Sequence, residues 1–107
     1  MTLPLNVTLF SRVLTAKTVS GDLNNVTDTG FYFVQKPVNG PITNWAHLIV
    51  NKNDDGSRVL QIFMPDQYND GLFVRLRNDN SWLDWKQLYF KEQVDAEVTR
   101  ILTSAEF

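Results

Sequence analysis

Side chains suited to binding an anionic sugar are found in the second half of the chain. Arg75 and Arg77 alternate along one predicted strand, and Trp82 follows on the next. Guanidinium groups bind carboxylate and phosphate oxygens through paired hydrogen bonds, and aromatic faces stack on sugar rings. The three residues therefore predict part of a site for an anionic glycopolymer. The alternative is a local packing contact, in which an arginine stacks on Trp82.

A second candidate binding segment is the loop from Met64 to Gly71, which carries Tyr68 among amide and carboxylate side chains. An aromatic ring surrounded by hydrogen-bonding groups is typical of small-ligand sites, including those for sugars. The loop therefore adds Tyr68 to the predicted ligand-binding residues. The alternative is an ordinary hairpin loop whose tyrosine folds back on the sheet.

Catalytic and metal-binding patterns are weak throughout the sequence. His47 is the only histidine, and it lies in a strand-like segment without a Gly-x-Ser-x-Gly motif elsewhere. The aspartates lie mostly in turn clusters, where they cap backbone groups. Residues 51–56 resemble the first half of a calcium loop, but Ile62 stands where such a loop requires glutamate, so a hairpin turn is the better interpretation. We therefore expect no catalytic residues, no metal and no cofactor.

The composition excludes several classes of protein. The chain has 107 residues, a formal net charge of -2, 43% hydrophobic residues and no cysteine. A near-neutral charge argues against a nucleic-acid binder, which would carry a basic stripe. No apolar run approaches the roughly 20 residues that a bilayer crossing requires, and no signal peptide is visible. These features predict a soluble domain with no nucleic-acid partner and no insertion into a membrane.

Short strand-like runs separated by turns predict a mainly β fold. Asn, Asp and Gly, which tolerate the positive φ of tight hairpins, cluster between runs rich in aromatic and β-branched residues. The pattern indicates a small antiparallel meander, because the links are too short for parallel crossovers. Within the last run, Trp82 and Trp85 are expected on opposite faces, with Trp85 buried. The predicted strands are 31–34, 45–51, 58–64, 72–77 and 82–89.

Two flanking segments predict burial against other copies of the chain. Residues 1–20 alternate like a strand but place apolar side chains on both faces. Residues 91–107 carry apolar residues at the four-three-four spacing of a coiled-coil seam, which a short isolated helix cannot hide. We expect an extended shaft-like β segment at 1–20, a β domain at 21–90 and a short C-terminal helix within 91–107. The alternative for that helix is folding back on its own sheet. The predicted oligomer-interface residues are Leu5, Val7, Leu9, Val94, Val98 and Ile101.

Parts of the sequence resemble the pyocin-knob domain of phage tail fibres. An Asp-Leu-Asn step at Asp22 leads through a polar turn to Gly30 and aromatic residues, as at the opening of that domain. Further segments are similar to its central strand, its arginine-bearing strand and its closing Trp-x-x-Trp-Lys element. The resemblance covers about residues 21–88. The matching segments are 22–32, 59–63, 72–77 and 82–88.

The resemblance implies a non-enzymatic module of a phage tail fibre or receptor-binding protein, located in the tail or baseplate of the virion. It implies a homotrimer with other tail proteins as partners and a bacterial surface glycan or teichoic-acid-like polymer as ligand. Two alternatives stay open: a structural spacer or trimerisation module without a ligand, and an accessory domain of a tail-associated depolymerase. We further expect positive φ at Gly30, and we expect Leu23 and Val26 to close one end of the sheet.

Overall fold

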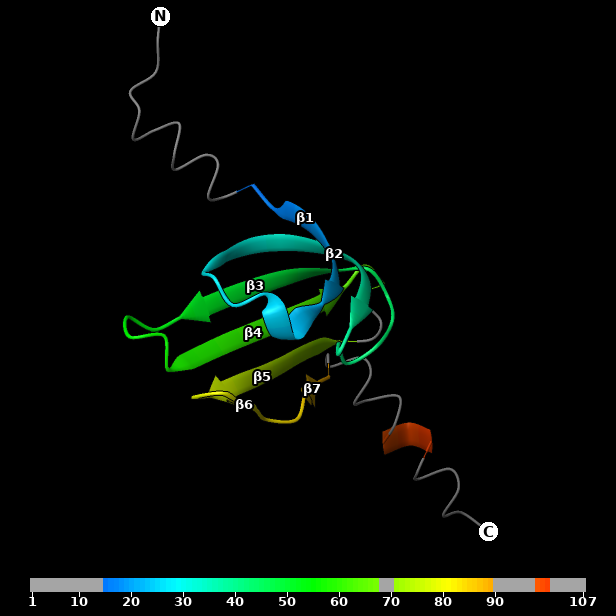
Figure 1. Cartoon of the computed structure of the whole chain (residues 1–107). Helices are drawn as coiled ribbons and strands as arrows, with labels where there is room; N and C mark the ends of the chain where they lie inside the picture. Colours follow the sequence, from blue (N-terminus) through cyan, green and yellow to red (C-terminus); the bar gives the residue numbers. More distant parts are fainter. Residues whose placement is uncertain (1–14, 68–70, 90–97, 101–107) are drawn as a thin grey trace, which may run out of the picture.

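The computed structural model describes residues 15–67, 71–89 and 98–100. This part of the protein is mainly β, as predicted, and its strands form one seven-stranded curled sheet (Figure 1). Residues 98–100 are helical. The elements are β1 (Lys17–Asp22), the 3₁₀ helix η1 (Leu23–Asn25), β2 (Gly30–Val38), β3 (Ala46–Lys52), β4 (Arg58–Pro65), β5 (Leu72–Asn78), β6 (Ser81–Trp82) and β7 (Lys86–Leu88).

Strands β2 to β5 form the antiparallel meander that the turn pattern predicted. Each strand pairs with its neighbour in sequence, so that Ile49 of β3 lies opposite Phe31 on one side and Ile62 on the other. Both β6 and β7 pair with β5, at the edge of the sheet opposite to β1. The corners use positive φ at Gly56 and Asp79, as tight turns between strands require.

The first strand differs from the prediction. β1 begins at Lys17, inside the segment expected to form a shaft, and it pairs with β2 in parallel. A parallel pair was not expected because the link is too short for a helical crossover. The chain uses the 3₁₀ turn of η1 and a short stretch at 26–29 instead. The register between β1 and β2 shifts by one residue between Ser20 and Gly21, so that Lys36 of β2 is skipped. Both Gly21 and Lys36 have positive φ, 105° and 49°.

The positive φ that was expected at Gly30 is wrong. Its φ is not among the positive values, which include those of Gly21 and Gly56. A Cβ at Gly30 would lie 3.4 Å from the hydroxyl of Tyr32. That hydroxyl donates a hydrogen bond to the backbone carbonyl of Asp28 at 2.6 Å. The separation from the Cβ position is an ordinary van der Waals contact, so the tyrosine fastens the preceding turn through its own hydrogen bond and does not require a glycine at position 30.

The inner face of the sheet carries the hydrophobic core. Leu23 of η1 is 1% exposed and packs on this face, and Val26 is partly buried beside it, so both close the sheet as predicted. In Figure 1, η1 lies across the face of the sheet. The buried residues of the strands are Val34, Ala46, Leu48, Val50, Val59, Phe63 and Phe73.

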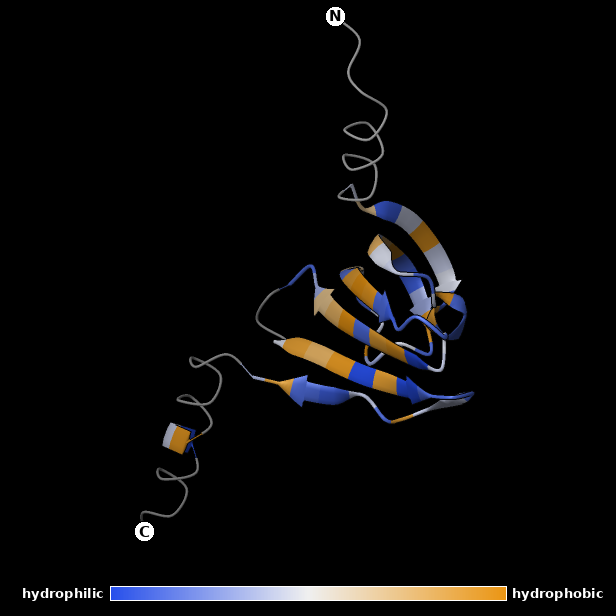
Figure 2. Cartoon of the chain, turned by 90° about the vertical axis from the view of Figure 1, so that its left-hand side faces the viewer, coloured by the Kyte–Doolittle hydropathy of each residue, from blue (hydrophilic) through white to orange (hydrophobic). Residues whose placement is uncertain are grey.

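The outer face of the sheet is also apolar, but much of it is exposed in the described residues. One row across the register contains Phe31, Ile49, Ile62 and Val74. Phe31, Ile49, Met64 and Leu76 are 37–48% exposed, whereas Phe33, Leu60, Ile62 and Val74 on the same face are partly buried. In Figure 2 the strands show hydrophobic colour broken by hydrophilic bands, as the sequences of β4 and β5 require, since Gln61, Arg75 and Arg77 lie among their apolar residues. The apolar residues of the outer face are Phe31, Phe33, Ile49, Leu60, Ile62, Met64, Val74 and Leu76, and the register also places His47, Asn51, Arg58, Asn78 and Lys86 on it.

Candidate functional site

Arg75 is a charged side chain buried in the inner face of the sheet. It occupies an inward position of β5 and is 6% exposed. Its guanidinium carbon lies 3.8 Å from the ring centroid of Trp82 and 4.5 Å from that of Trp85. Its Nε donates a hydrogen bond to Oε1 of Gln61 at 2.8 Å. The structure therefore brings together Arg75 and Trp82, two of the predicted ligand-binding residues, in the stacked arrangement that the packing interpretation describes.

Both tryptophans of the closing element lie on the same side of the sheet, so the expected opposite placement is wrong. The predicted strand 82–89 is interrupted at residues 83–85, between β6 and β7. The alternation of a continuous strand therefore does not apply across the pair. Trp82 and Trp85 are both partly buried against the core, and the Trp85 ring makes an edge contact with Phe63 at 5.8 Å between centroids.

Gln61 connects the arginine to the 3₁₀ turn. It is fully buried, and its Nε2 donates hydrogen bonds to the backbone carbonyls of Leu23 and Val26, each at 2.8 Å. A buried amide that is satisfied on both ends fixes η1 over the sheet. The sequence analysis did not single out Gln61. The available signal was a polar residue at an inward position between Val59 and Phe63.

Asp22 and Asn39 tie together the loops around the arginine. Oδ1 of Asp22 accepts hydrogen bonds from the backbone N–H of Asn24 and from Nδ2 of Asn39, both at 2.8 Å. These hydrogen bonds, that from Asn39 first, hold the pKa of Asp22 below its ordinary value. The indole N–H of Trp85 donates to the backbone carbonyl of Asn39 at 3.0 Å. The turn at Asn39 is thereby fixed to both η1 and the closing element.

A pocket of about 290 Å³ lies beside these contacts, and Arg75 and the two tryptophans are among its lining residues. Two buried polar atoms of its lining residues have no hydrogen-bond partner, Nη2 of Arg75 and Oδ1 of Asn24. Burial lowers the pKa of Arg75 to about 10, and the negative charge of Asp22 opposes that shift, so the guanidinium is protonated at neutral pH. The pocket therefore combines a cationic donor, a neutral acceptor and aromatic rings. Its lining residues are Asn24, Asn39, Gly40, Arg75, Trp82, Leu83, Asp84 and Trp85.

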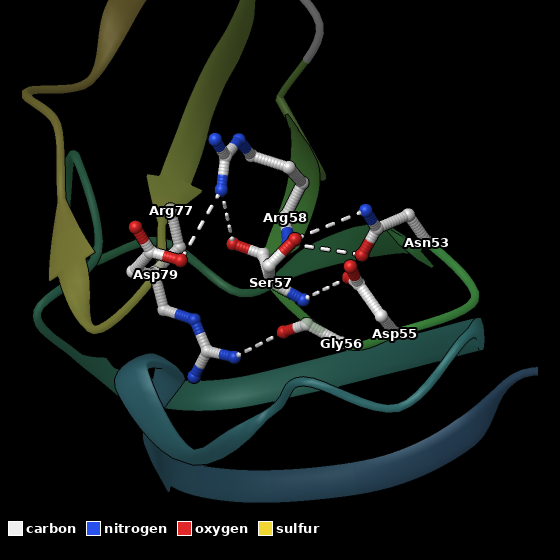
Figure 3. Close-up of polar contacts among 7 residues, drawn as sticks. All are labelled: Asn53, Asp55, Gly56, Ser57, Arg58, Arg77 and Asp79. Carbon is white, nitrogen blue, oxygen red and sulfur yellow. Dashed lines mark hydrogen bonds and ion pairs between the residues drawn. The ribbon is translucent and has the colours of Figure 1, made fainter.

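Arg77, the second predicted arginine, holds a hairpin corner and does not line the pocket. Its Nη2 donates to the backbone carbonyl of Gly56 at 3.2 Å (Figure 3). Its guanidinium carbon lies 5.7 Å from the Trp82 ring centroid, farther than that of Arg75. The geometry therefore gives Arg77 a packing and turn-binding contact.

The calcium-like segment at residues 51–56 is a hairpin corner, as the turn interpretation predicted. Oδ1 of Asn53 accepts from the backbone N–H of Arg58, and Oδ1 of Asp55 accepts from that of Ser57, each at 2.9 Å (Figure 3). These contacts direct the side-chain oxygens to the backbone. In the part of the chain that the structure describes, no three His, Asp or Glu side chains form a group that could hold a metal ion.

Most of the other predicted interface and binding residues lie outside the described residues. Val98 is described and is 49% exposed. Among the described residues, no helix is both long enough and apolar enough to span a membrane. The predicted residues outside the described ranges are Leu5, Val7, Leu9, Tyr68, Val94 and Ile101.

Comparison with known proteins identifies the fold. No protein-family model matches the chain. No curated protein matches its sequence either. Among solved structures, the chain is similar to the selenomethionine structure of an N-truncated R2-type pyocin tail fibre, with a TM-score of 0.60 over 74% of this chain and 16% sequence identity. The match covers 35% of the fibre chain, so the present chain spans about a third of its length. The sheet therefore has a pyocin-tail-fibre-like fold, in agreement with the resemblance noted in the sequence.

Proposed function

We propose that this chain is a non-enzymatic module of a phage-type tail fibre, which attaches the virion to a bacterial surface glycan as part of a homotrimer. The outer face carries the proposal, because a fold shared with a pyocin tail fibre here exposes an apolar surface across β2 to β5. Contiguous apolar patches of this kind mark interaction sites. The other partners in this proposal are further tail or baseplate proteins.

Assembly of identical copies fits the chemistry of the outer face. The centre of this face is aliphatic or aromatic apart from His47, and the charged residues Arg58 and Lys86 lie toward its margins. Burying a side chain such as Ile49 or Leu76 stabilises an assembly by up to roughly 1.5–3 kcal/mol relative to leaving it exposed. A symmetric oligomer hides the same patch on every subunit. Val98, half-exposed in the single chain, extends the proposed interface into the C-terminal segment.

Attachment follows from repetition of the pocket around the fibre axis. A single small pocket binds a sugar weakly, but three copies on one fibre raise the overall avidity by about 10²-fold or more when they engage together. Arg75 and Trp82 supply the binding groups in this proposal. Arg77 holds the adjacent hairpin corner in place, and Tyr68 stays a predicted ligand-binding residue. The alternative is a structural spacer, which the outer face supports as well because a spacer needs assembly but no pocket.

The whole chain, assembled as it is in solution, tests this proposal on immobilised bacterial surface polysaccharides and wall teichoic acids. We expect saturable binding that is lost in Trp82→Ala, since this removes a ring of the pocket. The matched control is Tyr89→Ala, which removes an aromatic side chain that is 59% exposed and does not line the pocket. A properly folded assembly that binds none of these polymers would favour the spacer and overturn the attachment function.

A further inference from the structure

We propose that the pocket formed by Arg75, Trp82, Trp85 and Asn24 binds an acidic sugar residue. Nη2 of Arg75 donates to an oxygen of its carboxylate or phosphate group, and Oδ1 of Asn24 accepts from a neighbouring hydroxyl. The inference rests on the proposed attachment function for its choice of a sugar as the ligand. It goes further by placing the site in this pocket, by limiting it to one acidic sugar unit and by naming the atoms that recognise that unit.

The first argument is the incomplete compensation of the Arg75 charge. Lys52 pairs with Asp28 and Arg58 pairs with Asp79, and none of these four residues lines the pocket. Asp22 acts on Arg75 through its charge, but its hydrogen bonds go to Asn24 and Asn39. A buried cation without an ion-pair partner is costly, and an anion entering the pocket offsets that cost.

The second argument is the position of the free donor. Oε1 of Gln61 accepts a hydrogen bond from the Nε–H of Arg75. The indole rings of Trp82 and Trp85 pack on the guanidinium group of Arg75. Nη2 is then a buried donor without a partner on a side chain that is 94% buried, the complement of its 6% exposure. Carboxylates and phosphates are the acceptors that an arginine binds most strongly, because the hydrogen bond is charge-assisted. The pocket therefore favours an anion over a neutral acceptor.

The third argument is the need for a hydroxyl as well as a charge. Oδ1 of Asn24 is a buried acceptor without a partner, and a simple anion has no aliphatic hydroxyl to donate to it. Asp84 lies exposed on the rim and offers further acceptor oxygens to hydroxyl groups. A pocket of about 290 Å³ is at the lower end of the roughly 300–1,000 Å³ typical of small-molecule sites. One acidic monosaccharide unit fits these conditions.

The whole chain labelled with ¹⁵N at tryptophan provides the test, because its three tryptophans include a built-in control. Trp82 and Trp85 line the pocket, whereas Trp45 does not and is 45% exposed. The probes are methyl glucuronide, glucose 6-phosphate, neutral methyl glucoside and inorganic phosphate. We expect glucuronide or the sugar phosphate to shift the indole N–H signals of Trp82 and Trp85 saturably. Trp45 stays unchanged.

The neutral glucoside is expected to bind at least about tenfold more weakly, since it offers the guanidinium only a neutral acceptor. Inorganic phosphate is expected to bind at least about tenfold more weakly than glucose 6-phosphate, since it has no sugar ring to stack on the indole rings. A stronger response to glucuronide identifies a carboxylate ligand, and a stronger response to glucose 6-phosphate identifies a phosphate ligand. Equal binding of glucoside and glucuronide, an equal response of Trp45, or no saturable response to either acidic sugar would overturn the inference.

A charge-removing variant checks the role of Arg75 directly. Arg75→Gln should reduce glucuronide binding to the level of the glucoside, while Arg58→Gln, at an exposed hairpin corner, should leave it unchanged. If Arg75→Gln does not fold, the probe series on the unaltered chain decides. Binding of wall polymers without any response to acidic sugars would overturn this inference alone. Binding of acidic sugars without binding of any polymer would overturn only the attachment function.

Discussion

The inner and outer faces of this sheet differ in a way that hydrophobicity alone does not explain. The inner face buries a glutamine and an arginine, Gln61 at 0% and Arg75 at 6% exposure. The outer face leaves Ile49 at 42% and Leu76 at 48% exposure, although these side chains gain more from burial. Two polar side chains are therefore buried within the apolar inner face, while aliphatic ones on the outer face of the same sheet stay partly exposed.

The difference between the faces reflects what covers each of them. η1 and the two tryptophans of the closing element cover the inner face, and the backbone carbonyls of the 3₁₀ turn need donors that Gln61 supplies. The outer face receives no comparable element from the described residues. We infer that the inner face is completed within one chain and that the outer face is completed by other copies. In this proposal, the ligand pocket and the assembly surface lie on opposite faces of one sheet.

The largest expected effect is a difference in stability between alanine variants of two neighbouring residues of β3, Leu48 and Ile49. Leu48→Ala should lower the free energy of unfolding by about 2–5 kcal/mol, because it empties part of a core in which Leu48 is fully buried. Ile49→Ala should cost about 1 kcal/mol in the dissociated subunit, because its side chain is partly exposed there. Urea unfolding of both variants, at concentrations that keep the chain monomeric, measures the difference. Equal losses would contradict the distinction between the two faces.

A smaller expected effect is the dependence of stability on pH that Asp22 causes through its hydrogen bonds beside the inner face. Hydrogen bonds from Asn39 and Asn24 lower the pKa of Asp22 from 3.8, so its contribution is present above about pH 3.8 and is lost as the pH falls through the lower folded pKa. Asp22→Asn keeps a good N-cap for η1 but has no carboxylate to titrate. We expect similar stability at pH 7 and a shallower loss of stability in acid for this variant. Identical acid profiles, followed by circular dichroism, would count against this role of Asp22.

Much of the fold was predictable because strand and turn signals are local. Aromatic and β-branched runs gave the meander of β2 to β5, and Asp-Gly at residues 55–56 gave its hairpin corner. The parallel β1 was missed because its pairing depends on the path of the link across the sheet, which no local signal encodes. Trp82 and Trp85 were placed on opposite faces because the run 82–89 was taken as one continuous strand. Asp84, a residue type depleted in strands, was the local signal for the interruption at 83–85.

The candidate site was predictable only in part, for a related reason. Arg75 and Trp82 carry recognisable chemistry, and adjacent strands bring them together. The sequence analysis did not predict Asn24, Asn39 and Gln61 as part of the site. Contacts between residues far apart in the sequence, such as that of Gln61 with Leu23, bring them to it. Arg77 shares the face of Arg75 but lies next to the hairpin corner, where the carbonyl of Gly56 binds it. Alternation along a strand predicts a common face and does not predict a common pocket.

The mass of the native chain in solution tests the central claim most directly, that the outer face joins identical copies. Light scattering should give three times the 12.3 kDa of one chain for the unaltered protein. Ile49→Asp, which places a charge in the middle of the outer face, should reduce the mass to that of one folded chain. Asn80→Asp adds the same charge at an exposed turn and should leave the trimer intact. A monomeric unaltered chain, or a trimer that persists in Ile49→Asp, would contradict the claim.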